Sequence, residues 1–445
     1  MAFVGDWRGN ATLLCGLLLL GGGASAESAQ ELDSVAPTLP KVLTMSQALD
    51  IFRKRGFDLL IAEATVRSAE GDLIIASGVA NPGLSGTLGK NFQCASSQDC
   101  GPLSYSVGVA DNNLVSTFVT GKYGLRKQVA NSALAAARWS RDDVQRLLET
   151  QLKQSYIAVL EAEALLQNAI ETRDSNLSTR KLNERRFELG AINEGDLAKI
   201  QVAALEAEQA VDQAEQARRT AKVALGFLLG FRTLVPDFQV DAAELDFTVP
   251  PPLETATRQS LLKEALGRRP DLLALLDQEK RADAAVSLAK REIVPDFGLS
   301  LTYSANGSGE TNISPPNLSL GLSFNLPIFY FQRGEIVKAE ADLTTQQILR
   351  EKAEATVVSD IETAWAGLVA TRQLVERMES TLLERAKQAR DIAKVQYDKG
   401  AASLLDLLDA QRTYTATRAE YAQDLANYWT AVAFLEQAMA GELRK

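Results

Sequence analysis

Two spacings of apolar residues divide the chain into segments with different predicted structures. Apolar residues that alternate with small or polar ones predict β-strands with one apolar face. Two proline-free stretches, residues 124–189 and 334–399, instead carry apolar or small residues three and four positions apart. That spacing predicts two very long helices of the coiled-coil type, and the many alanines favour close packing of several helices. The alternating segments are residues 84–88, 105–109, 297–303 and 318–326.

The order of these segments occurs twice, because the chain contains an internal duplication. Residues 55–60 recur at 268–273, an offset of 213, and residues 187–191 recur at 397–401, an offset of 210. Each copy is predicted to hold two helices, a strand hairpin, a long helix, a glycine turn and a final helix. The predicted parts are a signal peptide (1–26), a first repeat (27–230, with a hairpin at 83–118 and a helical tip near 190), a linker (231–256) and a second repeat (257–445, with a hairpin at 296–327 and a tip near 400).

Length decides how the predicted helices pair. A helix of ~65 residues spans on the order of 98 Å at 1.5 Å per residue. The two other helices of a copy have together ~60 residues and span about 90 Å, so they stack end to end as its antiparallel partner. The predicted fold is therefore mainly α with a small β part, and its long antiparallel helical hairpins form a narrow rod.

The four predicted strands are too few to close a barrel, since about eight is the smallest useful number. In lipid, an open sheet edge leaves unpaired backbone groups that cost several kcal/mol each. If the strands lie in a membrane, three chains therefore share one wall and form a trimeric 12-stranded transmembrane β-barrel, continued by an α-barrel. The alternative is a soluble hairpin that rests on the helices of its own chain.

The N-terminus has the pattern of a secretory signal peptide. An apolar run at residues 13–20 is followed by small residues that end at Ala26, where cleavage is expected. The mature chain keeps two cysteines, Cys94 and Cys100, and two cysteines this close usually pair in an oxidising compartment. The alternative is two free thiols, and two cysteines alone build no metal site.

Composition removes several classes of function. The net charge of −10 argues against nucleic-acid binding, which usually needs a basic face. The chain has no histidine, which excludes Ser-His-Asp catalysis and every histidine-based metal site. Neither a phosphate-binding P-loop motif nor a nucleophile elbow occurs in the sequence. We therefore expect neither an enzyme nor a cofactor, and a transport function must draw its energy from a partner.

Four motifs resemble the outer-membrane efflux protein (TolC) family over essentially the whole mature chain. Residues 186–197 and 397–412 are similar to the family's periplasmic tip motif, and residues 120–126 and 325–336 are similar to its strand-to-helix junction. The resemblance implies a homotrimer with a β-barrel in the outer membrane and a helical barrel that crosses the periplasm. Its tips close like an iris and dock onto a periplasmic adaptor protein, itself bound to an inner-membrane pump of the RND or ABC type.

The resemblance also assigns site residues. Two family aspartates that line the pore constriction match Asp406 and Asp409, whose spacing of three places both on one helix face. In a trimer, six carboxylates at the entrance favour cations and raise some of the pKa values. The alternative is that acidic residues in a first helical turn complement the helix dipole. The family's gate tyrosine and aspartate match Tyr397 and Asp196, whereas Ala402 stands where the family has an arginine.

The adaptor is expected to contact the two turns, because glycine permits a left-handed backbone and close approach. The expected contact residues are Gly190, Gly400, Arg186, Phe187 and Leu407. Two segments, at Asn81 and Pro82 and at residues 326–329, look most like the heavy-metal-efflux branch of the family. A duct without histidine offers soft metals few ligands, so drug or organic cargo stays open. Two other functions compete with the efflux duct: a periplasmic coiled-coil scaffold, and the outer-membrane channel of a type I protein secretion system.

Overall fold

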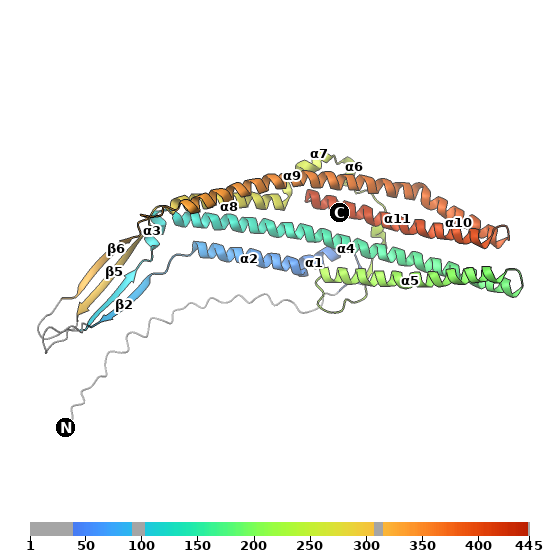
Figure 1. Cartoon of the computed structure of the whole chain (residues 1–445), viewed down its shortest axis with the longest axis horizontal. Coiled ribbons are helices and arrows are strands. Elements are labelled where there is room, and N and C mark those ends of the chain that lie inside the picture. The colour runs from blue at the N-terminus through green and yellow to red at the C-terminus, as the bar shows by residue number, and fades with distance from the viewer. Residues whose placement is uncertain (1–38, 91–102, 307–314, 444–445) are drawn as a thin grey trace, which may run out of the picture. The chain divides into compact units, whose positions relative to one another are not determined.

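Helices that run alongside one another make up most of the computed structural model, which carries a small sheet at one end (Figure 1). The structure describes residues 39–90, 103–306 and 315–443, all within the unit Leu39–Lys445. The predicted signal peptide at residues 1–26 and the predicted pair Cys94 and Cys100 lie outside the described residues. The predicted fold class, mainly α with a small β part, is confirmed.

The first half of the chain contains one unbroken helix of 67 residues, α4 (Lys122–Glu188). Its length agrees with the continuous spacing of apolar and small residues in this stretch. The other elements of this half are β1 (Val42–Leu43), α1 (Met45–Arg55), α2 (Phe57–Ser77), β2 (Gly83–Gly89), β3 (Ser104–Ala110), α3 (Leu114–Val119) and α5 (Glu194–Leu228).

The second half repeats this order, but its long helix is interrupted. The helix predicted over residues 334–399 consists of α9 (Arg333–Arg377) and α10 (Leu383–Asp398), separated by the π-helical turn η2 (Met378–Leu382). In this turn the N–H of Leu383 donates to the carbonyl of Met378, five residues back. The remaining elements are β4 (Gln239–Val240), η1 (Ala242–Leu245), α6 (Pro251–Thr255), α7 (Arg258–Arg268), α8 (Pro270–Arg291), β5 (Phe297–Asn306), β6 (Asn317–Phe324) and α11 (Leu404–Met439).

The strands form one antiparallel sheet in the order β2-β3-β5-β6, so the hairpins of the two copies meet at β3 and β5. In this register Val109 lies opposite Leu301. The first hairpin ends at Ala110 and does not reach residue 118 as expected. The carboxylate of Asp111 accepts the N–H groups of Asn113 and Val115, which turns the chain into the short helix α3.

The two faces of this sheet differ completely in chemistry. One face carries rows of apolar side chains, such as Leu84, Val109, Leu301 and Leu320, which are neighbours across all four strands. Leu84 and Leu320 are 79% and 78% exposed, so no part of the described chain covers this face. The opposite face carries serine, threonine and glycine, and none of the four strands contains a charged residue.

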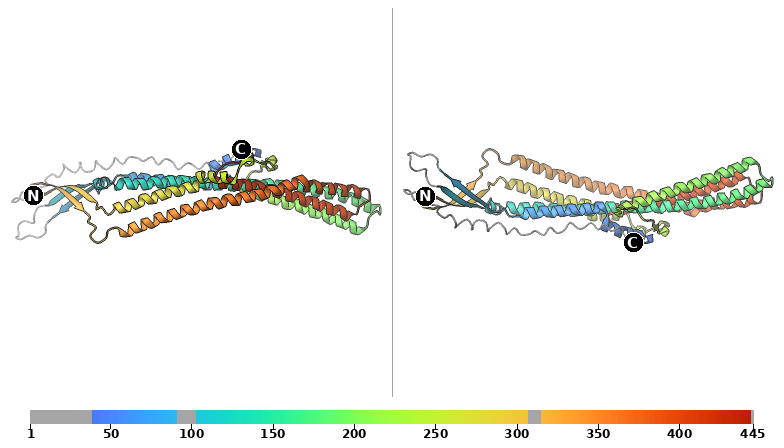
Figure 2. Two further views of the ribbon diagram at one scale, coloured as in Figure 1. Left: turned by 90° about the horizontal axis from the view of Figure 1, so that it is seen from above. Right: turned by 90° about the horizontal axis from the view of Figure 1, so that it is seen from below.

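The long helix α4 packs against α2 and then α5 along its length, and also against α8 and α11. Figure 2 shows the same arrangement from two further sides. A central core, which includes Tyr156, Leu225, Tyr428 and Trp429, lies where α1, α4, α11 and the linker meet. A separate apolar cluster, here called the tip cluster, lies near the two glycine turns and consists of Ile200, Ala203, Tyr397, Leu404, Leu407 and Leu408. No helix in the described part of the chain is long and apolar enough to cross a bilayer.

Candidate functional site

The two glycine turns that end the long helices have the same backbone geometry. Gly190 and Gly400 have φ values of +71° and +76°, which residues other than glycine rarely adopt. The N–H of Ala191 donates to the carbonyl of Arg186 at 2.8 Å, and the N–H of Ala401 donates to the carbonyl of Gln396 at 2.7 Å. These are the hydrogen bonds of a Schellman motif, which closes a helix and reverses the chain.

Each turn is followed by a capped helix that carries acidic residues. The side chain of Ser403 accepts the N–H of Asp406, and the Asp406 carboxylate accepts the backbone N–H and the hydroxyl of Ser403 at 3.0 and 2.8 Å. These hydrogen bonds from Ser403 hold the pKa of Asp406 below its usual value. In a single chain the capping interaction is therefore present, whereas the raised pKa values expected at the entrance need carboxylates from neighbouring chains.

Asp409 lies one turn further along α11 and is exposed, as Asp406 is. Among the described residues no hydrogen bond or ion pair involves its carboxylate. The opposite face of this helix start is apolar and buried, with Leu404, Leu407 and Leu408 in the tip cluster. The two aspartates therefore point away from the packed side of the tip and are available to line an entrance.

Leu407 differs from the expectation of an exposed adaptor contact. It is only 4% exposed, because it packs in the tip cluster with Ile200 of α5 and Tyr397 of α10. Phe187, in contrast, is 40% exposed next to the first glycine turn, and Leu189 beside it is exposed as well. Leu405, which follows the second turn, is 65% exposed, so both turns contribute apolar surface to the tips.

Tyr397 is buried and joins the second hairpin to the first. Its hydroxyl donates to the side-chain oxygen of Asn183 on α4, and the Asn183 amide donates to the carbonyl of Thr179 at 2.8 Å. The guanidinium carbon of Arg186, one turn further along α4, lies 4.8 Å from the centre of the Tyr397 ring. Arg186 also donates to the carbonyl of Asp398 at 3.3 Å.

Asp196, the predicted partner of Tyr397, is held within its own turn. Its carboxylate accepts hydrogen bonds from the Asn193 amide at 3.0 Å and from Lys199 at 3.1 Å. Within the described part of the chain, no hydrogen bond joins Asp196 to Tyr397, and Asn183 takes that place. The contact between the two hairpins is therefore made by a residue that the sequence motif did not indicate.

Asn183 belongs to a series of buried asparagines on α4. The regular spacing of this series is the one sequence feature that indicates a contact role for Asn183. Asn168, Asn176 and Asn183 lie eight and seven residues apart, close to the heptad spacing of a helix seam. The Asn168 amide donates to the carbonyl of Thr415 on α11 at 3.0 Å, and the Asn176 amide donates to the carbonyl of Ala203 on α5 at 3.2 Å. Each buried asparagine thus fixes α4 against a different helix.

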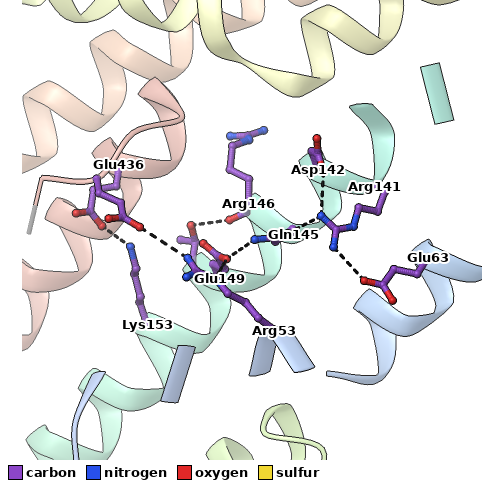
Figure 3. A network of polar contacts seen from close by, with 11 residues as sticks. Arg53, Glu63, Arg141, Asp142, Gln145, Arg146, Glu149, Lys153 and Glu436 are labelled. Atoms are coloured by element: carbon purple, nitrogen blue, oxygen red, sulfur yellow. Dashed lines mark hydrogen bonds and ion pairs between the residues drawn. The ribbon is translucent and has the colours of Figure 1, made fainter. Parts of the chain in front are cut away.

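Far from the tips, a network of charged residues ties α4 to the helices around it (Figure 3). Arg53 of α1 pairs with Glu149 of α4 at 2.7 Å, and Lys153 of α4 pairs with Glu436 of α11 at 2.6 Å. Glu436 is buried, so its pairing with Lys153 holds α11 firmly against α4 at this level. Because α4 spans Lys122–Glu188, these ion pairs fix its middle part against α1 and α11.

Comparison with known proteins gives a consistent result over the length of the chain. A family model described as outer membrane efflux protein matches residues 48–231 and 261–441. The cobalt-zinc-cadmium resistance protein CzcC of Cupriavidus metallidurans is 24% identical over 412 residues, covering 91% of this chain and 93% of that protein. The pyoverdine export outer membrane protein OpmQ of Pseudomonas aeruginosa is 30% identical over 436 residues, covering 94% and 86%.

Solved structures show the same fold. The crystal structure of CusC has a TM-score of 0.73 at 20% identity and covers 89% of this chain and 92% of CusC. The CmeC outer membrane channel of Campylobacter jejuni has a TM-score of 0.72 at 18% identity, covering 89% and 85%. The two segments that match the family model begin 213 residues apart, at residues 48 and 261, which equals the offset between the first parts of the sequence repeats.

Proposed function

The chain belongs to the outer membrane efflux protein family, and we propose that three copies of it form the outer-membrane exit duct of a tripartite efflux system. The observation that carries this proposal is the sheet, which has an exposed apolar face, an uncharged polar face and two edge strands, β2 and β6. An apolar face suits lipid, and a face of serine, threonine and glycine suits a water-filled lumen.

The edges of the sheet explain why several copies are needed. β2 and β6 each have a hydrogen-bonded neighbour on one side only. In lipid the unpaired backbone groups of such an edge cost several kcal/mol each, and pairing with another copy removes that cost. Three four-stranded sheets joined edge to edge close a 12-stranded barrel, which is wide enough to enclose a passage.

The helix tips form the other end of the duct. In a trimer, the exposed Asp406 and Asp409 of three chains form two acidic rings at the entrance, where they raise the local concentration of cations. Asp406 also caps its helix, so the two roles considered for it are compatible. Asp409 makes no capping hydrogen bond in the described chain, so its only proposed role is at the entrance.

The partners of the duct are a periplasmic adaptor and an inner-membrane pump. The adaptor contacts the exposed part of the two turns, with Phe187, Gly190 and Gly400 as its contact residues and Arg186 at their edge. The relatives named for metal resistance and for pyoverdine export indicate that ducts of this family serve cargoes of different chemistry. We propose that the pump selects the cargo and that the duct contributes only a preference for cations.

Mass and conductance measurements on purified protein test this proposal. We expect a particle of three chains that stays in solution only with detergent, that dissociates on heating, and that conducts ions across a planar bilayer. The heated, dissociated sample is the control and conducts nothing. A single chain that stays soluble without detergent contradicts the duct and supports the alternative of a periplasmic scaffold.

A further inference from the structure

A cavity of about 500 Å³ lies halfway along the helices, at the end of α11 and the start of α8. α11 ends at Met439 and α8 begins at Pro270, and α4 and α9 border the cavity on its other sides. A mostly apolar cavity of this size with a few polar groups is typical of binding sites for small organic molecules. Its apolar lining consists of Leu147, Ala364, Gly367, Ala431, Phe434 and Ala438.

Small side chains keep this cavity open. Ala364 and Gly367 line it from α9, and Ala431 and Ala438 line it from α11. A Cβ atom at Gly367 would meet no other atom within 4 Å, so packing within the chain does not require a glycine there. Glycine inside a helix is less stable than alanine, and no close contact offsets that loss at this position. The free space at Gly367 is therefore part of the cavity.

Two arginines and three aspartates form the polar end of the cavity. Arg146 donates to Asp143 at 2.6 Å. Arg269, which is 3% exposed, donates to Asp271 at 2.6 Å and to Asp360 at 2.7 Å. The group thus has one negative charge in excess. Asp360 presents that charge to the cavity, since its side chain is 42% exposed and the other two carboxylates are more buried.

The cavity opens on the side of the helices that faces away from the linker. Trp429 of α11 donates to the carbonyl of Leu245 in η1 at 3.2 Å, which places this side of α11 against the linker. The cavity is lined by Ala431, Phe434 and Ala438 of the same helix. With 3.6 residues per turn, these three lie roughly 140–200° around the helix from Trp429. They are therefore on the opposite face of α11.

In the proposed trimer this opposite face is the inner one. The helices α1 and α7 and the linker project from one face of the helical layer (Figure 2). Three copies of these elements would fill the passage of a narrow tube, so they lie on its outside. All residues that line the cavity come from one chain, and the trimer therefore has three equivalent cavities at one level of its inner wall.

We propose that this cavity binds an amphipathic organic cation, with the positive group beside Asp360 and the apolar part against Phe434 and Leu147. Phe434 and Leu147 are 46% and 43% exposed, so their apolar surfaces are accessible to such a molecule. An aromatic ring also attracts a cation, which adds to the charge of Asp360. The proposal rests on the proposed duct for one point, that the cavity opens into the passage. There, weak and reversible binding concentrates such solutes halfway along the duct without stopping their flow.

Equilibrium dialysis of the purified protein in a non-ionic detergent tests the binding. The probe is 4-phenylbutylamine, which is a cation at neutral pH. The control is 4-phenylbutyrate, which has the same ring and a similar chain but a negative end, and protein-free micelles give the blank. We expect one bound amine per chain and at least tenfold weaker binding of the butyrate, because only the amine complements Asp360.

Two substitutions test the position of the site. Asp360→Asn removes the charge and is expected to weaken binding of the amine about tenfold. Gly367→Leu fills the cavity and is expected to abolish binding, and it alters no charge if Asp360→Asn disturbs the pairing of Arg269. Glu362→Gln is the matched control, because Glu362 pairs with Arg258 of α7 at 3.0 Å, on the outer face. It is expected to leave binding unchanged. The temperature of trimer dissociation shows that each variant is folded.

The outcomes separate this inference from the proposed function. Equal affinity for the amine and the butyrate, or unchanged binding in Gly367→Leu, overturns the site. In planar bilayers, the amine is expected to reduce the current through wild-type trimers and not through Gly367→Leu trimers. Binding that depends on Gly367 in a protein that never conducts supports the site and overturns the duct. Trimers that conduct without binding the amine overturn the site and leave the duct in place. Binding without any effect on the current overturns the position on the inner wall.

Discussion

At the scale of single residues, the two aspartates at the start of α11 differ in their contacts. Asp406 is engaged by Ser403, whereas Asp409 has no partner among the described residues. A substitution at Asp406 therefore changes the helix cap and the charge together. A substitution at Asp409 changes the charge alone, which makes it the cleaner probe of the duct.

Asp409→Asn is expected to lower the preference of the trimer for cations over anions without lowering its thermal stability. The physical reason is that, in the proposed trimer, the change removes three charges from the entrance, where passing ions are close to them. The reversal potential in a salt gradient measures this preference. Asp212→Asn on the exposed side of α5 removes the same number of charges elsewhere and serves as the control. An equal shift in both variants argues against an entrance at Asp409.

Tyr428 gives a prediction for the dependence of stability on pH. Burial raises its pKa to about 12, and its hydroxyl donates to the carbonyl of Thr248 at 3.0 Å. A tyrosine with a raised pKa in the folded state stabilises the fold fully below the pKa of the unfolded chain, about 10, and this contribution is lost as the pH rises toward 12.

Tyr428→Phe should therefore lower the free energy of unfolding by about 1 kcal/mol at pH 8, because the variant lacks the hydrogen bond to the Thr248 carbonyl. Between pH 10 and 12 the wild-type protein should lose stability more steeply than the variant, because only the wild-type residue must ionise on unfolding. Thermal melting at a series of pH values measures the difference. Parallel curves for the two proteins above pH 10 contradict a buried, neutral Tyr428.

At the scale of elements, a buried lysine connects the sheet to the longest helix. Lys122, at the start of α4, is 1% exposed and contacts Asp296 at 2.9 Å, Glu292 at 3.1 Å and the carbonyl of Val294 at 2.9 Å. It thus joins the first-copy helix to the second-copy segment that leads into β5. Ser116 of α3 joins the same two segments, since its hydroxyl donates to Asp296 at 3.1 Å, so Lys122 is the charged member of a small group of links between the two halves.

Lys122→Met is expected to destabilise the protein by about 2–3 kcal/mol, since it leaves the Asp296 carboxylate and the Val294 carbonyl without the buried ammonium group that contacts them. The loss should appear as a lower temperature of dissociation of the trimer in detergent. Arg126→Met is the control, because Arg126 is half exposed and lies 3.8 Å from Glu292. Equal effects of the two changes would show that Lys122 does not carry the connection.

The helices, turns and strands are the part of the structure that the sequence predicts best. The long helix α4, the glycine turns and the strand pairs follow from apolar spacing and capping residues, which act locally. The π-turn was missed, because Val375, Met378 and Leu382 keep the three-and-four spacing of an unbroken helix. At the tips, the aspartates were found by motif, whereas Asn183 and the burial of Leu407 depend on contacts between helices that are distant in the sequence.

At the scale of the whole molecule, the two faces of the sheet give a direct test of its environment. Leu320 and Ser319 are adjacent on β6 and point to opposite faces. Leu320→Lys places a charge on the apolar face, which costs about 2–4 kcal/mol near the middle of a bilayer, and should reduce the yield of heat-resistant trimers. Ser319→Lys should keep the yield and shift the ion preference toward anions. If both variants assemble equally well, the apolar face does not meet lipid.

The absence of charge from the four strands has a consequence for how such proteins are used. A wall of hydroxyl and glycine surfaces neither holds nor repels a passing solute according to its sign, so the final stretch of the route imposes no chemical demand. Whatever recognition a bacterium needs can then evolve upstream, in components that meet the solute first. In the proposed assembly, a cell that acquires a new pump needs an adaptor that fits the two glycine turns, and can keep the same exit.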